Sequence, residues 1–342
     1  MIQRLKEIEK FCLETISQGQ LENGEFKTYL FFPDKPENGW IYAGPSVFIT
    51  SSIAINLLKN HNIKDKKICK NAAQYIRSQM EEDGLWRFYP HHGLFKFNTP
   101  MDIDDTCLAS FLLKNENISF PDNKTLIYKQ LNKKGEFYIW FLPRLIFLNN
   151  IRIFFRFLFD LRFSFPIFFS LKGRTTAALI NYNDTEHAVN ANAILYLGEN
   201  LKTKKTINHL VEDLLFGNNH NQYFYPSILY TYFHVSRLYS DLEIKQIENL
   251  KNKVINYFKN EYDIDKMNIQ DKAIAILTLL NFNINIPILK ILITDISGSS
   301  FDEIAKPFGY FCTKDRTMFG GSIEYTCSII SESIRKYILN YY

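Results

Sequence analysis

Three carboxyl groups fall within four residues at Asp102-Ile103-Asp104-Asp105. An isolated aspartic acid has a pKa of about 3.9 and is ionised at neutral pH. Neighbouring carboxylates and burial both disfavour the charged form, so a buried cluster can keep a proton near neutrality and titrate as one coupled unit. The chemistry that this spacing allows is general acid catalysis near neutral pH.

The same cluster has a plainer structural interpretation. Thr99-Pro100 directly precedes it, and this turn predicts that the aspartates occupy the first turn of a helix. Free N–H groups and the helix dipole stabilise carboxylates there, so acids in this position are ordinary helix caps. That setting favours the ionised form and opposes the effect of burial. The sequence alone leaves both interpretations open.

The elements that must position these acids are helices. Apolar residues recur at three- and four-residue intervals along most of the chain, and strand-like alternation is scarce and short. One form repeats: a turn rich in Gly, Pro or Asp, then a helix that opens on small and polar residues. Its members begin at Gly44-Pro45-Ser46, Thr99-Pro100-Met101-Asp102, Asn183-Asp184-Thr185-Glu186 and Gly320-Gly321-Ser322, with Ala273 to Leu280 as a plainer member.

More polar helices are predicted between these segments, at 63–80, 207–216 and 242–258. Small residues let the first kind pack closely in an inner ring, and the polar kind suits an outer ring. We therefore predict an all-α fold, an α/α barrel (toroid) of alternating inner and outer helices that forms a single domain over residues 1–342.

A second repeat places a glutamine shortly before Gly-x-aromatic. It occurs at Gln20 to Gly24-Glu25-Phe26, at Gln79 to Gly84-Leu85-Trp86 and at Gln130 to Gly135-Glu136-Phe137. Glycine can end a helix in a left-handed conformation, the ring can pack back on the last turn, and the amide can bond helix-end groups. Chance explains one such match more easily than three.

Composition narrows the function. With 342 residues, 46% apolar and 22% charged, the chain can bury a large core. A net charge of +4, with both signs scattered, argues against nucleic-acid binding. Five cysteines without Cys-x-x-Cys spacing suit a reducing compartment, and the charged start Met1 to Glu7 has no apolar export run, so we expect a cytoplasmic protein.

One segment interrupts the repeats, from Phe141 to Gly173. It is rich in Phe, Leu and Ile, yet four arginines and Asp160 fall within it, which makes a spanning helix a poor interpretation. We interpret 141–173 as an aromatic and basic insertion. It could lie in a membrane interface and associate the protein with a membrane, or fold over the barrel with its arginines reaching water.

The segment Lys70 to Trp86 resembles the QW repeat of squalene-hopene and oxidosqualene cyclases. Tyr75-Ile76, Gln79 and Gly84-Leu85-Trp86 fall in the order of that repeat, although Asn71 stands where a small residue is usual. Asp102-Ile103-Asp104-Asp105-Thr106 resembles the D-x-D-D motif of class II terpene cyclases. The resemblance covers most of the chain as one barrel, whereas the family usually pairs two.

This resemblance implies a terpene cyclase of the isomerase or lyase type, which starts cyclisation of a linear isoprenoid, such as a prenyl diphosphate, by protonating an alkene. Asp104 would be the acid, with Asp102 and Asp105 as its hydrogen-bonding supports. A diphosphate substrate would call for Mg²⁺; otherwise no cofactor is expected and no metal ligand is assigned. His187 heads an inner-type helix and could orient the acid or act as the final base.

Carbocations need faces of π-electron density, and a diphosphate would need cations. The aromatic candidates for substrate binding are Trp86, Phe88, Tyr89, Trp140, Tyr310 and Phe311, and the polar candidates on an inner helix are Asn190 and Asn192. The candidate cations, in predicted loops, are Arg87, Arg174, Lys314 and Arg316. Taken singly, each also fits an ordinary place in the core or on the surface.

An alternative function remains open. A non-catalytic barrel could bind a lipid or a protein partner, and the missing second barrel and the insertion at 141–173 support this alternative. The three aspartates would then only cap a helix. The protein could also form an oligomer.

Overall fold

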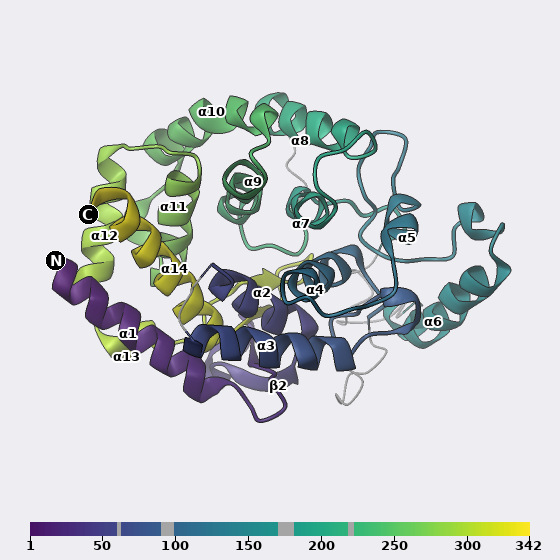
Figure 1. The fold of residues 1–342 in the computed structure, drawn as a ribbon, viewed down its shortest axis with the longest axis horizontal. Coiled ribbons are helices and arrows are strands. Elements are labelled where there is room, and N and C mark those ends of the chain that lie inside the picture. The colour runs from purple at the N-terminus through teal and green to yellow at the C-terminus, as the bar shows by residue number, and fades with distance from the viewer. Residues whose placement is uncertain (60–62, 90–98, 170–180, 218–221) are drawn as a thin grey trace.

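The computed structural model describes residues 1–59, 63–89, 99–169, 181–217 and 222–342, and leaves the side chains of 63–64 and 161–169 undescribed. Within these ranges six helices form a closed inner ring (Figure 1). They are α2 (Val47–Leu57), α4 (Ile103–Asn115), α7 (His187–Leu197), α9 (Ile228–Leu242), α11 (Ile269–Asn281) and α14 (Ile323–Tyr341). Each packs against the next in chain order, and α14 packs against α2 to close the ring.

Shorter or more polar helices surround this ring (Figure 1). They are α1 (Ile2–Gly19), α3 (Ile63–Ser78), α5 (Lys124–Tyr128), α8 (Lys204–Phe216), α10 (Lys251–Asn256) and α12 (Pro287–Gly298), with the short α13 (Phe301–Ile304). Outer α1 packs on α14, α3 on α2 and α4, α8 on α7, and α12 on α11. The predicted α/α barrel of alternating inner and outer helices is confirmed.

Burial follows the sequence patterns that led to this prediction. Every residue of α2 is buried, including its serines and threonine, so this helix is surrounded on all sides. Outer α1 instead buries one stripe, Leu5, Ile8, Cys12 and Ile16, at three- and four-residue spacing. The predicted outer helix at 242–258 is the poorest match. Glu243 adopts a positive φ and ends α9 after Leu242, so the outer segment begins later, as a 3₁₀ helix at Lys245–Leu250 that continues into α10.

Four short strands join the two ends of the chain at one side of the ring. β1 (Lys27–Phe31), β2 (Ile41–Pro45), β3 (Phe311–Cys312) and β4 (Phe319–Gly321) form an antiparallel sheet in the order β2-β1-β4-β3. Tyr29 pairs with Gly321, which brings the turn before α14 against the strand that leads toward α2. The sheet thus helps to close the ring.

The repeated Gln…Gly-x-aromatic turns share one structure. All three glycines have a positive φ, 95° at Gly24, 72° at Gly84 and 95° at Gly135. A Cβ at Gly24 would overlap the backbone oxygen of Asn71 on α3, and one at Gly84 would overlap that of Pro121. The turns at Gly24 and Gly84 therefore pack against backbone so closely that only glycine fits, whereas Gly135 meets the side chain of Lys205.

The aromatic residue of each turn ties the outer ring to the inner ring. Phe26, Trp86 and Phe137 are fully buried. Each donates its backbone N–H to the fourth residue of the following inner helix, at 3.2 Å to Thr50 Oγ1, 3.1 Å to Thr106 Oγ1 and 2.8 Å to Asn190 Oδ1. This repeated hydrogen bond fixes the position of α2, α4 and α7 along their axes relative to the turns that precede them.

The inner helices run in one direction around the ring. Near their starts, Gln270 Oε1 of α11 accepts a hydrogen bond from Thr326 of α14, and the Ser52 hydroxyl of α2 lies 3.3 Å from that of Tyr310. In their later turns, Arg237 of α9 donates to Asn56 of α2 at 2.5 Å. The first turns of these inner helices thus lie near one another, and so do their later turns. Residues at the helix starts therefore gather at one end of the barrel.

The segment predicted as an insertion forms a 3₁₀ turn at Leu145–Phe147 and the helix α6 (Ile151–Phe169), which projects from the ring (Figure 1). Arg87 makes a buried ion pair with Asp160 of α6 at 2.7 Å, and Arg152 and Arg156 reach Asp83 at 2.6 and 3.0 Å. These arginines attach α6 to the turn after α3. None of the helices in the described ranges is both long and apolar enough to cross a bilayer.

The repeated turns can be tested with a matched pair of glycines. Gly24 and Gly44 have nearly the same φ, 95° and 94°, but space is open around a Cβ at Gly44. We expect Gly44→Ala to lower the free energy of unfolding by ~1–2 kcal/mol, the cost of a left-handed backbone for alanine. Gly24→Ala should cost about 2 kcal/mol more because the new methyl group meets backbone.

Urea denaturation of the two variants and the wild type, followed by circular dichroism, measures this difference. Equal losses in the two variants would show that the turn does not pack tightly against α3.

Candidate active site

The aspartate cluster begins α4, and its three members have different roles. Asp102 is the N-cap residue, and its Oδ1 accepts the backbone N–H of Asp105 at 2.7 Å. The helix-cap interpretation therefore describes Asp102. The side chain of Asp104 instead lies against two other elements, where Oδ1 accepts Asn192 Nδ2 and Oδ2 accepts the Tyr225 hydroxyl, both at 2.7 Å.

Asp104 also differs from its neighbours in exposure. Ile103 and every residue from Asp105 to Ser110 are buried, whereas Asp104 retains accessible surface. Asp102 and Asp105 are only 4% and 2% exposed, and their carboxyl groups are hydrogen-bonded to each other. Of the three acids, Asp104 is the one that a ligand could reach.

Two opposing effects act on the proton of Asp104. Burial raises its pKa, while the hydrogen bonds from Tyr225 and Asn192 stabilise the carboxylate and lower it. Burial is the larger effect and leaves the pKa at about 6. Burial likewise raises the pKa of Asp102 to about 7 and that of Asp105 well above its usual range. The helix start therefore does not keep the cluster at the acidity of free aspartate.

Tyr225 lies in the segment before α9, and several contacts fix its backbone. The Glu186 carboxylate accepts the N–H groups of Phe224 and Tyr225 at 3.0 and 3.2 Å. Cys312 N donates to Phe224 O at 2.8 Å, and Arg316 Nη1 donates to Tyr225 O at 2.8 Å. Burial raises the pKa of Glu186 to about 8. The loop that presents Tyr225 to Asp104 is thus held from α7 and from the sheet.

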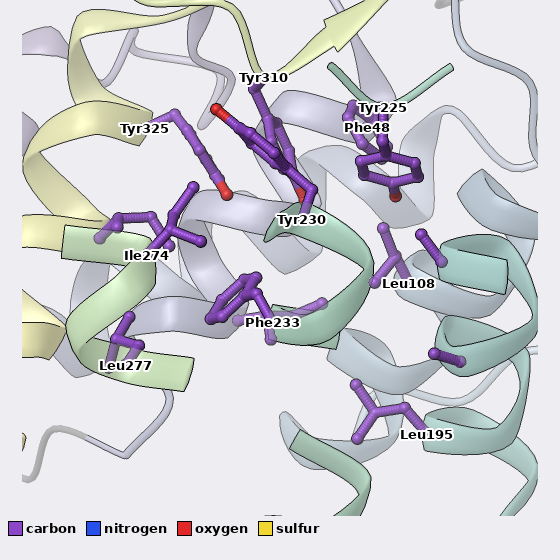
Figure 2. Close-up of a cluster of buried hydrophobic side chains, with 14 of the residues drawn as sticks. Phe48, Leu108, Leu195, Tyr225, Tyr230, Phe233, Ile274, Leu277, Tyr310 and Tyr325 are labelled. Atoms are coloured by element: carbon purple, nitrogen blue, oxygen red, sulfur yellow. The ribbon is translucent and has the colours of Figure 1, made fainter. Parts of the chain in front are cut away.

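A cluster of aromatic rings lies at this end of the barrel (Figure 2). Tyr310 stacks on Phe48 with ring centroids 4.8 Å apart and on Tyr325 at 3.7 Å. Tyr225 meets Phe48 edge to face at 6.0 Å. Figure 2 shows the tyrosines grouped above Leu195 and Leu277, which belong to later turns of their helices. The aromatic rings and the acid therefore share the end where the inner helices begin.

Most of the predicted aromatic residues reach this cluster. Phe88 packs against Phe311 at 4.8 Å and against Tyr89 at 4.9 Å, and Phe88 and Phe311 both contact Phe48. Trp140 lies next to it, edge to face with Phe224 at 5.5 Å. Trp86 is elsewhere, because its indole N–H donates to Ile76 O at 2.8 Å and its ring packs on Phe120.

The predicted polar residues on α7 separate into three positions. Asn192 contacts Asp104, as described above, and also donates to the Tyr225 hydroxyl at 3.0 Å. Asn190 has a structural role, since its Oδ1 accepts the backbone N–H of Phe137 in the preceding turn. His187 Nε2 lies 2.7 Å from Asp213 on outer helix α8, so this nitrogen faces the outer ring.

The predicted cations make contacts within the protein. Arg87 is buried between Glu81, at 2.8 Å, and Asp160. Lys314 Nζ lies 2.6 Å from Asp184 Oδ1, and Arg316 bonds the backbone of the Tyr225 segment. Arg174 lies outside the described residues. Three of the four predicted cations thus stabilise the segments around the site through contacts within the protein.

Sequence analysis did not identify Phe48, Tyr225, Glu186 or Tyr325 as site residues. Glu186 and Phe48 each lie at the start of a predicted inner helix, and Pro226-Ser227 directly after Tyr225 is the same kind of turn. Their position at or just before the start of an inner helix was the feature of the sequence that could have identified them as candidates. Among the residues with described placement, no group of three or more His, Cys, Asp or Glu side chains is arranged to hold a metal ion.

The raised pKa values predict how stability depends on pH. Between pH 4 and 7 the folded protein binds more protons than the unfolded chain, because Asp104 and Asp102 titrate near 6 and 7 instead of near 3.9. The free energy of unfolding should therefore fall as the pH rises through this window. Asp104→Asn removes one titrating group, so its decline should be smaller by roughly 2–3 kcal/mol.

Urea denaturation at pH 4 and pH 7 measures both declines, with Asp302→Asn as the control at an exposed carboxylate. Parallel declines in wild type and Asp104→Asn would contradict the raised pKa of Asp104.

No family model matches this chain, and no curated protein matches it by sequence. Solved structures do match its fold. The type II terpene cyclase MstE from Scytonema, without ligand, has a TM-score of 0.67 at 11% identity, over 98% of this chain and 99% of that one. A variant of MstE bound to its product, merosterolic acid A, has a TM-score of 0.68 at 11% identity, over 98% and 97%.

A protein from Actinoplanes has a TM-score of 0.67 at 12% identity, over 98% of this chain and 99% of that one. Further MstE variants contain the substrate geranylgeranyl dihydroxybenzoate. At these identities the comparison concerns the fold: the chain has the fold of a type II terpene cyclase over nearly its whole length.

Proposed function

We propose that this protein is a class II terpene cyclase-like enzyme in which Asp104 protonates an alkene of a linear isoprenoid and starts its cyclisation. The observation that carries the proposal is the setting of Asp104, a partly exposed residue whose carboxyl group has a raised pKa and accepts the hydroxyl of Tyr225 in an aromatic cluster. The fold supports it, because structures with this fold include a cyclase that binds a geranylgeranyl substrate.

The contacts of Asp104 indicate which oxygen carries the proton. Asn192 Nδ2 can only donate, so Oδ1 is the acceptor and the proton belongs on Oδ2. The Tyr225 hydroxyl donates to one lone pair of Oδ2 and leaves the O–H direction for the alkene. Both hydrogen bonds strengthen when the carboxylate forms, so they stabilise the product of proton transfer more than the starting acid.

The proton adds to one carbon of the alkene and leaves a cation on the other. The π-electrons of the next alkene along the chain attack this cation, so a ring bond forms and the charge moves on. The rings of Phe48 and Tyr310 lie beside Tyr225, and Phe311 contacts Phe48, so this cluster would stabilise the charge while keeping water away. Loss of a proton at the end makes the reaction an isomerisation.

The acid step is tested with a matched pair of buried carboxyl groups. Asp271 also begins an inner helix, also accepts a tyrosine hydroxyl, at 3.0 Å from Tyr230, and has a pKa that burial raises to about 6. We expect Asp104→Asn to lower turnover by at least about 100-fold, because an amide cannot donate the acidic proton. Asp271→Asn should stay within about threefold of wild type.

The purified variants are incubated with farnesyl diphosphate, geranylgeranyl diphosphate and geranylgeranyl dihydroxybenzoate, with and without Mg²⁺, and cyclic products are measured by mass spectrometry. Equal turnover in Asp104→Asn and wild type would contradict the assignment of the acid. No cyclic product from wild type on any of the three substrates would favour a non-catalytic barrel that binds a lipid or a protein partner.

We also propose that α6 brings the enzyme to the membrane surface from which such an insoluble substrate is taken. Its arginines already bind carboxylates of the barrel, so the helix is fixed with its other side outward. Ile151, Phe155 and Leu158 are exposed on that side at helical spacing, as are Leu145 and Leu148 just before them. Aromatic and aliphatic side chains on one face of a helix suit the headgroup boundary of a bilayer.

Vesicle flotation tests this contact, with vesicles of equal parts zwitterionic and anionic phospholipid. Serine at Ile151, Phe155 and Leu158 together should weaken vesicle binding at least about tenfold, because three apolar side chains no longer leave water. The control is serine at Leu201, Phe216 and Leu339, which are even more exposed and lie on other elements. Wild type that stays unbound, or an α6 variant that loses only self-association in size-exclusion chromatography, would contradict membrane contact.

A further inference from the structure

One imidazole lies in the aromatic cluster without a hydrogen-bond partner. His234 of α9 is 2% exposed, and neither of its ring nitrogens has a partner among the described residues. A buried polar group left in this state costs about 1–3 kcal/mol. The structure therefore keeps an uncommitted donor and an uncommitted acceptor inside the barrel.

The surroundings of His234 place it next to the candidate acid site. Its ring meets Tyr225 edge to face with centroids 4.9 Å apart, and Tyr310 lies 6.3 Å away. Tyr225 is the residue whose hydroxyl bonds Asp104. One aromatic ring thus stands between the imidazole and the group that binds the acid.

The imidazole is in its neutral form. Burial lowers the pKa of His234 well below 6.5, and the positive charge of Arg237, one turn further along α9, lowers it further. One ring nitrogen therefore has a free lone pair throughout the physiological pH range. A carbocation is a far stronger acid than an imidazolium ion, so even a weakly basic imidazole can remove its proton.

Neighbouring hydroxyl groups are already engaged. Tyr225 donates to Asp104, Tyr230 donates to Asp271 and to Gly309 O, and the hydroxyl of Tyr310 lies 3.3 Å from that of Ser52. The hydroxyl of Tyr325 also has no partner among the described residues, but a phenol oxygen is a far weaker base than an imidazole nitrogen. His234 therefore carries the most basic free lone pair of the cluster.

We infer that His234 is the base that ends the cyclisation, an assignment that rests on the proposed function. A C–H bond next to the final cationic carbon breaks, and its electron pair becomes the new C=C bond. The proton joins the lone pair of the imidazole, and the rings of Tyr225 and Tyr310 beside it stabilise the imidazolium ion. Water then accepts this proton, and Asp104 regains one from water, so the atoms balance as an isomerisation.

The test separates the last step from the first. His234→Phe keeps the ring and removes the lone pair, and His234→Gln keeps hydrogen bonding without a basic nitrogen. In both variants we expect substrate consumption within about threefold of wild type, because protonation by Asp104 is unchanged. More than about half of the product should shift to other alkene isomers or to alcohols formed by water capture.

Products are identified by mass spectrometry after reaction in D₂O, where one deuterium from Asp104 reports that the first step has occurred. Tyr232→Phe is the matched control, since Tyr232 is also buried on α9 but packs on Tyr257 of the outer ring. It should leave the product mixture unchanged. Circular dichroism shows which variants are folded.

An unchanged product mixture in both folded His234 variants would overturn the assignment and leave the role of Asp104 intact. Loss of substrate consumption and of deuterium incorporation would overturn it as well, because His234 would then act in the first step. A wild-type protein that converts none of the three isoprenoids would overturn the proposed function itself, and this outcome is recognised before any variant is made.

Discussion

The contact between Asp104 and Tyr225 is the constraint around which this end of the barrel is organised. It joins the start of α4 to the segment before α9, across α7, which contributes Asn192 to the same pair of oxygens. The contact has two opposing consequences. The hydrogen bonds stabilise the carboxylate, while the burial that comes with them favours the neutral acid by more. The result is an acid that is held in place and loses its proton near pH 6 instead of near pH 4.

That contact requires each inner helix to have a fixed position along its axis relative to its neighbours. The repeated turns fix this position. The backbone N–H groups of Trp86 and Phe137 bond the fourth residues of α4 and α7, so both helices are placed by the same device. Asp104 is the second residue of α4, and Asn192 is the sixth of α7. An error of one residue in either helix would shift its side chain by about 1.5 Å and turn it through about 100°, enough to break the contact.

Local patterns in the sequence predicted the frame and part of the site. The periodicity, the helix-opening turns and the three Gln…Gly-x-aromatic elements are encoded by neighbouring residues, which is why the alternating rings were predictable. Tyr225 and Glu186 could not be assigned roles in the same way, because what matters is their distance from Asp104 and from each other in space. Asn190 and Asn192 look alike in the sequence, but they lie about 200° apart around α7, so one bonds the outer turn and the other faces the acid. Arg87, Lys314 and Arg316 were proposed from their charge and their places in predicted loops, and neither feature reveals the contacts that they make within the protein.

The direction of the inner helices also bears on how such a reaction would proceed. Their N-terminal ends carry partial positive charge, so the carboxylate that Asp104 leaves after proton transfer lies where anions are stabilised. The helix dipoles alone stabilise a carbocation least at that end and better toward the later turns, where side chains such as Leu195 and Leu277 exclude water. Each ring closure moves the charge along the chain and away from Asp104. His234 is the seventh residue of α9, roughly 9 Å along the helix from its first residue. On the proposed mechanism, the acid at the helix starts and the imidazole two turns deeper are therefore separated along the direction in which the charge travels.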